Sequence, residues 1–151
     1  MTAAAKQATD VMAVADRLRP TVLQLARELR RERIAGVSSQ QVGLLVSIKY
    51  TPGITVGELA VEERVSTAAM SKRVSRLERD GLVTRTPSET DRRQVGLTLS
   101  DEGQRVLRRV RSRRTAWLAS RLDTLSPDEL ARVGAAVDAL SHLLAGEKSG
   151  A

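Results

Sequence analysis

The residues with the clearest chemistry lie on one predicted helix over residues 66–80. At about 100° per residue, three apolar side chains share one face of this helix and suit a buried core. The apolar face carries Met70, Val74 and Leu77, and the opposite face carries Ala68, Lys72, Ser75, Arg76 and Arg79. This second face is small near its start and cationic after it, which suits insertion into a DNA groove, where bulk near the bases would clash.

The segments around this helix predict how it is held. Before it, Thr55 and Glu58 have the spacing of a capping box and open a shorter helix. After it, Gly81 ends the helix and a strand follows over residues 82–86. A second strand over residues 95–99 alternates Val95, Leu97 and Leu99, which is typical of a half-buried strand. The order is therefore helix, turn, helix and wing.

Three motifs in this region resemble the MarR family. They are the run Arg-Leu-Glu-Arg-Asp-Gly-Leu-Val-Thr-Arg over residues 76–85, the tip Asp91-Arg92-Arg93, and Leu-Thr-Leu-Ser-Asp-Glu-Gly over residues 97–103. Their order and spacing carry the resemblance, which covers about residues 10 to 145. It implies a dimeric winged-helix transcription regulator of the kind found in bacteria and archaea.

The helix face and the resemblance together predict a DNA-binding site. Lys72, at the centre of the outward face, is expected to reach a base edge or a phosphate in the major groove. Arg73 lies at the border of the faces and is expected to reach a phosphate, and Arg76 is expected to bind the backbone or brace the wing. Small residues approach the DNA beside them: Thr67, Ala68, Ser71 and Ser75. The alternative is an ordinary solvated helix face.

The resemblance places a second contact at the wing tip. Arg93 would enter the minor groove, where the negative potential is enhanced, and Asp91 would orient its guanidinium by accepting a hydrogen bond. Arg92 would contact a phosphate. The alternative is a tip that is solvated and contacts nothing.

The predicted fold class is mainly α-helical with a small two- or three-stranded β-wing, in a single domain over residues 1–151. Residues 38–100 form the winged helix-turn-helix lobe, which opens with a capping box at Ser38. Residues 10–35 and 101–146 form the dimerisation helices, namely helices one, five and six. Residues 1–8 are expected to be frayed, and Pro20 is expected to kink one long first helix.

Apolar side chains three and four residues apart form a seam along the outer helices. This seam exceeds what one small DNA-binding lobe needs to cover, so it predicts a symmetric homodimer. It consists of Val11, Val14, Leu18, Val22, Leu25 and Leu29 in the first helix, and Leu130, Val133, Val137, Leu140 and Leu144 in the last.

Composition and charge restrict the possible functions. The net charge is +7, and residues 64–114 alone carry 14 basic and 6 acidic residues, so the basic centre indicates a polyanionic partner. A merely soluble basic surface is the alternative. The chain has no cysteine, which excludes disulfides, thiolate nucleophiles and cysteine-ligated metals. No apolar run spans a bilayer and no signal-peptide segment is present, so we expect a cytoplasmic protein without a membrane partner.

Two features stay open at this stage. The resemblance implies an effector, often a small aromatic or phenolic molecule, between the dimer helices and the DNA lobe, with Val14, Leu18, Tyr50 and Trp117 as candidate pocket residues. The arginine cluster over residues 105–114 either extends the DNA-facing potential, pairs with acidic residues in the dimer, or is a solvated face. His142, the only histidine, is expected to be structural, and no metal or cofactor is expected.

The predicted function is a sequence-specific DNA-binding regulator, with repression favoured, acting as a homodimer on a pseudo-palindromic operator. Non-specific or architectural DNA binding is the main alternative, and a helical scaffold without nucleic acid is another. An enzyme is disfavoured, because the sequence shows no nucleophile–base pair, phosphate-binding glycine loop or metal set.

If Arg93 enters the minor groove, Arg93→Ala should weaken operator binding by about 1–3 kcal/mol. A gel-shift titration measures this loss. Unchanged affinity would remove the wing from the mechanism.

Overall fold

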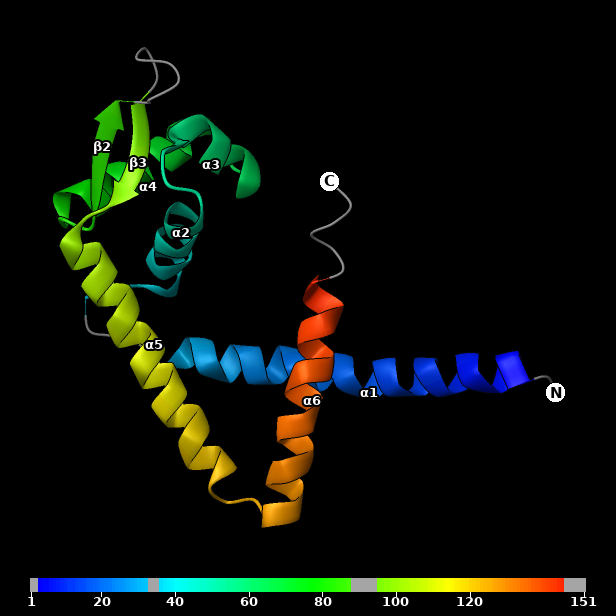
Figure 1. Ribbon diagram of the computed structural model, residues 1–151. Helices are drawn as coiled ribbons and strands as arrows, with labels where there is room; N and C mark the ends of the chain where they lie inside the picture. Colours follow the sequence, from blue (N-terminus) through cyan, green and yellow to red (C-terminus); the bar gives the residue numbers. More distant parts are fainter. Residues whose placement is uncertain (1–2, 33–35, 88–94, 146–151) are drawn as a thin grey trace. The chain divides into compact units, whose positions relative to one another are not determined.

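The computed structural model describes residues 3–32, 36–87 and 95–145, and confirms a mainly helical chain with a small antiparallel sheet (Figure 1). Its elements are α1 (Ala3–Arg31), α2 (Ser39–Tyr50), β1 (Ile54–Thr55), α3 (Val56–Glu62), α4 (Thr67–Arg79), β2 (Val83–Pro87), β3 (Val95–Leu99), α5 (Asp101–Leu122) and α6 (Pro127–Ala145). The chain divides into two compact units within α5, residues 1–114 and residues 115–151.

Polar side chains cap the helix starts, as their spacing predicts. The Ser38 hydroxyl accepts a hydrogen bond from the Gln41 N–H, and the Gln41 side chain accepts one from the Ser38 N–H. The same reciprocal pair joins Thr55 to Glu58. Hydrogen bonds from Thr55, led by its backbone N–H, hold the pKa of Glu58 below its ordinary value. These boxes set where α2 and α3 begin.

The sheet has the strand order β1–β3–β2, and both pairings are antiparallel. This settles the predicted two- or three-stranded wing at three strands. The predicted start of β2 at Leu82 is wrong by one residue, because β2 begins at Val83 and extends to Pro87, which lies opposite Val95. The β1–β3 pairing requires a glycine at position 96, since a Cβ there would lie 2.6 Å from the carbonyl oxygen of Gly53.

The core of the first unit lies where α2, α3 and α4 pack against the sheet and the start of α5. Its fully buried side chains are Leu44, Leu45, Ile48, Leu59, Met70, Val74, Leu77 and Leu97. The predicted apolar face of α4 is thus confirmed. The strict burial alternation predicted for β3 is not, because Val95 is 44% exposed at the end of the strand, beyond the core.

The first helix differs from the prediction at its start. It begins at Ala3 rather than near Asp10, so residues 3–8 are helical and not frayed. The segment Ala-Ala-Ala-Lys-Gln-Ala over residues 3–8 explains this, since alanine, lysine and glutamine have high helix propensity. Pro20 lies inside this single helix, as expected.

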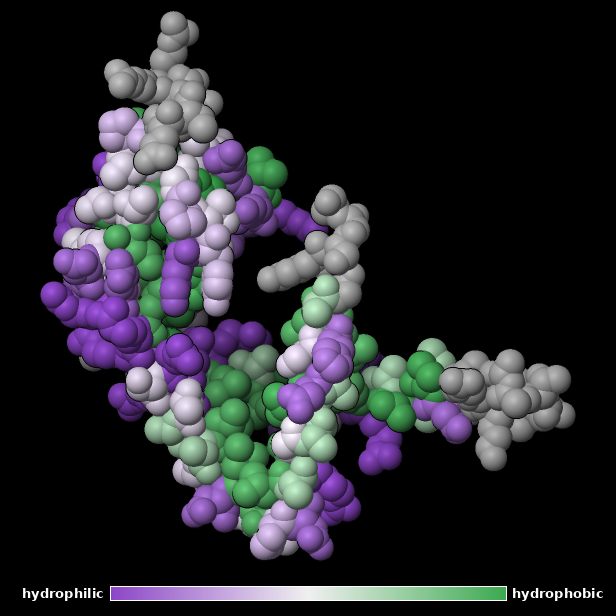
Figure 2. Space-filling view, viewed as in Figure 1, coloured by the Kyte–Doolittle hydropathy of each residue, from purple (hydrophilic) through white to green (hydrophobic). Residues whose placement is uncertain are grey.

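Helices α1 and α6 expose apolar side chains. Val11, Met12 and Val14 are exposed on α1. Figure 2 shows hydrophobic side chains at the surface of this helix. None of the described residues of α6 is buried, although Leu130, Val133 and Val137 follow a helical stripe. Each unit, taken by itself, therefore leaves apolar area uncovered. Among the described helices, none has the length and apolar content that crossing a membrane requires.

Two glycines that differ in their surroundings test this packing. Gly96→Ala should lower the free energy of unfolding by about 1–3 kcal/mol, because the new methyl group meets the backbone of Gly53. Gly43→Ala, in the interior of α2 with open space around the added methyl, should raise it by about 0.4–1 kcal/mol. Urea unfolding of both variants measures the difference, and equal effects would contradict the close approach at Gly96.

Candidate nucleic-acid interface

A tight turn joins α3 to α4 and sets the helix-turn-helix geometry. Arg64 adopts a left-handed conformation with φ of 53°, and its N–H donates to the carbonyl oxygen of Val61. The N–H of Val65 returns to the carbonyl oxygen of Ala60. Ser66 then caps α4 by accepting a hydrogen bond from the Ala69 N–H. The chain thus reverses within a few residues, and α3 braces α4.

The outer surface of α4 has the predicted character. Thr67, Ala68, Lys72 and Arg76 are exposed, whereas Ser71, Arg73 and Ser75 are half-buried. Burial of Met70, Val74 and Leu77 forces this orientation. The structure therefore brings together the seven predicted residues of the helix. The wing-tip residues Asp91, Arg92 and Arg93 lie outside the described residues.

A groove of about 270 Å³ lies between α4 and the start of α2. Its lining residues are Ser38, Gln40, Gln41, Leu44, Lys72, Arg73 and Arg76. The Gln41 amide joins the two helices by donating to the Asp80 carboxylate at 3.1 Å. Sequence reasoning missed Ser38 and Gln40 as neighbours of the α4 cations. The capping motif marked the start of α2, but only the packing of α2 against α4 brings these residues beside Arg73.

An ion pair fixes α4 to the wing strand β2. The Arg85 guanidinium donates from Nε to Glu78 Oε1 at 2.7 Å and from Nη2 to Oε2 at 3.1 Å. This contact raises the pKa of Arg85 above its ordinary value. Two parallel hydrogen bonds restrict orientation as well as distance. Helix α4 and the base of the wing are therefore linked by side chains as well as by the chain itself.

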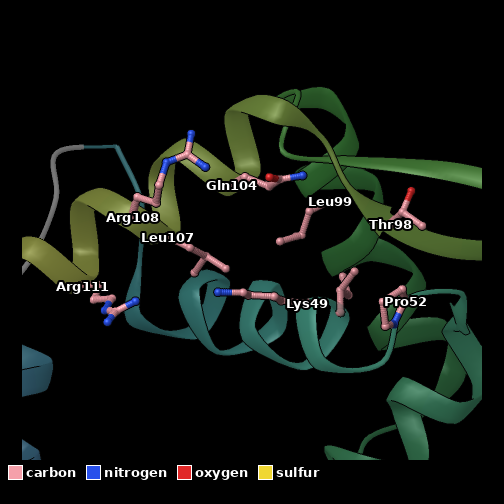
Figure 3. A pocket seen from close by; sticks show the side chains of 9 residues that line it. Lys49, Pro52, Thr98, Leu99, Gln104, Leu107, Arg108 and Arg111 are labelled. Atoms are coloured by element: carbon pink, nitrogen blue, oxygen red, sulfur yellow. The ribbon is translucent and has the colours of Figure 1, made fainter.

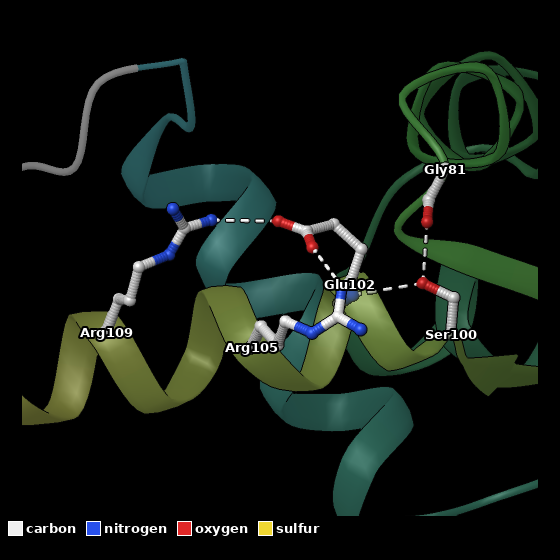
Figure 4. A network of polar contacts seen from close by, with 6 residues as sticks. Gly81, Ser100, Glu102, Arg105 and Arg109 are labelled. Atoms are coloured by element: carbon white, nitrogen blue, oxygen red, sulfur yellow. Dashed lines mark hydrogen bonds and ion pairs between the residues drawn. The ribbon is translucent and has the colours of Figure 1, made fainter.

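Five of the six arginines in the cluster on α5 fall into two groups. Arg105 and Arg109 both donate to the Glu102 carboxylate at 2.9 Å (Figure 4), and Arg113 donates to Glu32 at 3.4 Å. These pairs form within one chain. Arg108 and Arg111 instead line a cavity (Figure 3). Three arginines are therefore paired with acidic residues of their own chain, and two line the cavity.

This cavity, of about 430 Å³, lies between the end of α2, the end of β3 and the first half of α5. It combines apolar side chains with three cations. Its lining residues are Ile48, Lys49, Pro52, Thr98, Leu99, Gln104, Leu107, Arg108 and Arg111. The four residues expected at an effector pocket (Val14, Leu18, Tyr50 and Trp117) are all described, and none lines this cavity.

Two of those four residues are the aromatic side chains of the chain. Tyr50 is 78% exposed, with the Lys49 ammonium 5.9 Å from its ring centre. Trp117 belongs to the second unit, and the Arg121 guanidinium carbon lies 5.2 Å from its ring centre. In the described part of the chain, no group of three or more acidic or histidine side chains is placed to hold a metal ion.

Comparison with known proteins identifies the family. The MarR family model matches residues 37–95. An HTH-type transcriptional regulator of Mycobacterium tuberculosis is 34% identical over 124 residues, which cover 82% of this chain and 87% of that protein. This chain belongs to the MarR family.

Further relatives agree with this assignment. The HTH-type transcriptional repressor MdtR of Bacillus subtilis is 34% identical over 95 residues, which cover 63% of this chain and 61% of that protein. The transcriptional regulator Tm0710 of Thermotoga maritima has the same fold, with a TM-score of 0.79 and 26% identity over 93% of this chain and 99% of that one. As a MarR family protein, this chain is a DNA-binding transcriptional regulator with a winged helix-turn-helix fold.

Proposed function

We propose that this MarR family protein is a homodimeric repressor that reads a pseudo-palindromic operator with α4 and the wing. The observation that carries the proposal is the exposed cationic surface of α4, centred on Lys72 and Arg76, over a fully buried apolar face. Lys72 contacts base edges or phosphate in the major groove, and Arg73 and Arg76 bind the backbone. These phosphate contacts make affinity fall steeply with salt.

The groove beside α4 supports the same orientation. A phosphate placed near Arg73 and Arg76 would also face the start of α2, where Ser38 and Gln40 lie. The first backbone N–H groups of a helix, together with its dipole, favour a negative charge. In this arrangement α2 helps to position the protein on the DNA backbone, while sequence is read by α4.

The uncovered apolar faces of α1 and α6 support a homodimer. Apolar side chains are exposed along both helices, including Val14 and Val22 on α1 and Val137 and Leu144 on α6. Burial of such faces against a second copy would stabilise association by about 25 cal/mol per Å² of apolar surface removed from water. A two-fold dimer presents two recognition helices to half-sites about one helical turn apart. Repression is favoured by the relative MdtR, which is a repressor.

The cavity between α2, β3 and α5 favours an effector with a negative charge. Its three cations, Lys49, Arg108 and Arg111, surround apolar side chains that include Leu99 and Leu107. We therefore propose that a small aromatic or phenolic acid binds here and weakens DNA binding. Such a ligand acts only by favouring a shape of the protein that fits the operator less well. Regulation of this kind takes place where the chromosome lies, in the cytoplasm.

Selection from a random duplex library should recover a pseudo-palindromic sequence that the wild-type protein prefers by about 10³-fold or more over random DNA. Lys72→Gln should then lose about 1–3 kcal/mol of operator binding. Arg105→Gln is the matched control, since it removes one charge from a residue that pairs with Glu102. Competition gel shifts measure both variants. A protein without sequence preference would support the architectural alternative, and equal losses in both variants would remove Lys72 from the site.

Benzoate and its uncharged amide test the effector proposal. Benzoate at up to about 10 mM should reduce operator affinity and bind by calorimetry, whereas benzamide should do neither, because only the carboxylate pairs with the cations. Arg108→Gln should abolish the benzoate response while retaining DNA binding. Equal responses to the two compounds, or an unaltered response in Arg108→Gln, would contradict the proposal.

A further inference from the structure

The first turn of α5 holds the segment that directly follows the recognition helix. The Ser100 N–H donates to the carbonyl oxygen of Leu82 at 3.1 Å. The Ser100 hydroxyl donates to the carbonyl oxygen of Gly81 at 2.6 Å, and it accepts a hydrogen bond from the Gly103 N–H at 3.0 Å (Figure 4). One serine thus joins α5 to both residues of the turn after α4.

The backbones of α5 and of the turn after α4 lie in close contact at this joint. Gly103 is buried, and a Cβ at this position would clash with the carbonyl oxygen of Leu82. Gly81 has a φ of 70°, which a residue with a side chain adopts at a cost. Leu82 is only 4% exposed. The backbone of α5 therefore lies directly on the backbone that ends the recognition helix.

This joint lies between two parts that the proposed function must connect. On one side, the Glu78–Arg85 ion pair joins α4 to the base of the wing. On the other side are Thr98 and Leu99, immediately before Ser100, and Gln104, one turn after it, all of which line the 430 Å³ cavity. Ser100 therefore lies in the chain between the residues of the cavity wall and is hydrogen-bonded to the turn that ends α4.

We propose that Ser100 is a positioning residue for DNA recognition, because its bond to Gly81 sets the angle between α5 and the unit formed by α4 and the wing. This inference rests on the proposed homodimeric DNA binding. The thirteen residues of α4 span about 20 Å at 1.5 Å per residue, so a rotation of about 5° at the joint moves the far end of the helix by roughly 2 Å. A base-pair step is about 3.4 Å, so such a rotation changes which half-site spacing the dimer accepts.

A purely structural role of Ser100 is the alternative to its role in positioning the recognition helix. The Ser100 hydroxyl also caps α5 by accepting from Gly103, and loss of a cap alone reduces stability. Three substitutions divide the two functions of the hydroxyl. Ser100→Thr keeps the donor and the acceptor. Ser100→Asp keeps the acceptor that caps the helix but has no proton to donate to Gly81, and Ser100→Ala keeps neither.

The test uses the selected operator and two versions with one base pair added or removed at its centre. Wild type and Ser100→Thr should prefer the selected spacing by about tenfold or more, and Ser100→Asp and Ser100→Ala should reduce that preference to about threefold or less, in line with the loss of one hydrogen bond. Affinity for random duplex should change little in Ser100→Ala. In Ser100→Asp, the affinity for random duplex measures how much the added negative charge weakens DNA binding at any spacing.

Thr124→Val is the matched control, since it removes one hydroxyl hydrogen bond to a backbone carbonyl, that of Arg121 at 2.7 Å, in the turn after α5 and outside the residues of the joint. It should keep the preference for spacing, and thermal melting should show all variants folded. The proposal is overturned if Ser100→Asp behaves as wild type while Ser100→Ala does not, because capping alone would then explain the effect. It is also overturned if Thr124→Val matches Ser100→Ala, or if wild type tolerates all three spacings. Failure to select any operator would instead overturn the proposed function itself.

Discussion

Burial of one stripe of α4 is the constraint on which the DNA-facing surface depends. Met70, Val74 and Leu77 are fully enclosed by the core, so the helix has no freedom to rotate about its axis. Burial of each such side chain contributes about 1.5–3 kcal/mol to stability. An exposed ion pair contributes only about 0–1 kcal/mol. The cationic side of α4 is therefore turned outward by the hydrophobic effect, and its charges take no part in setting that orientation.

The charged residues then divide according to their partners. Glu78 forms an ion pair with Arg85, which connects α4 to β2. Glu102 pairs with Arg105 and Arg109, which reduces the repulsion between like charges along α5. The partly exposed pairs contribute little to stability, but they remove cations from the pool that could attract DNA. Lys72 and Arg76 on α4 and the cations of the cavity wall lie outside these pairs. Pairing thus changes where the positive charge of the surface is available to a polyanion, while the net charge stays +7.

The local elements followed from short-range chemistry. Capping pairs at Ser38 and Thr55, glycine at position 81 and helical spacing in residues 66–80 predicted where helices begin and end, because each depends on hydrogen bonds within a few residues. The sequence-based predictions were wrong or incomplete where longer-range contacts determine the structure, or where the local signal is weak. The strand β1 forms only by pairing with β3, some forty residues later, and Val95 is exposed because the core ends before it. The helical start at Ala3 was missed because it has no capping signal.

By itself, the sequence determined the helix-turn-helix and wing, the apolar stripe of α4 and the cationic residues opposite it, since these are properties of one segment and its periodicity. Tertiary structure alone decided which distant residues meet. It placed Ser38 and Gln40 beside Arg73, brought Lys49 and Arg108 to one cavity, and set the Ser100 hydroxyl on the carbonyl of Gly81. The physical reason is that such neighbours are produced by packing of the core, whose geometry no local pattern of residues encodes.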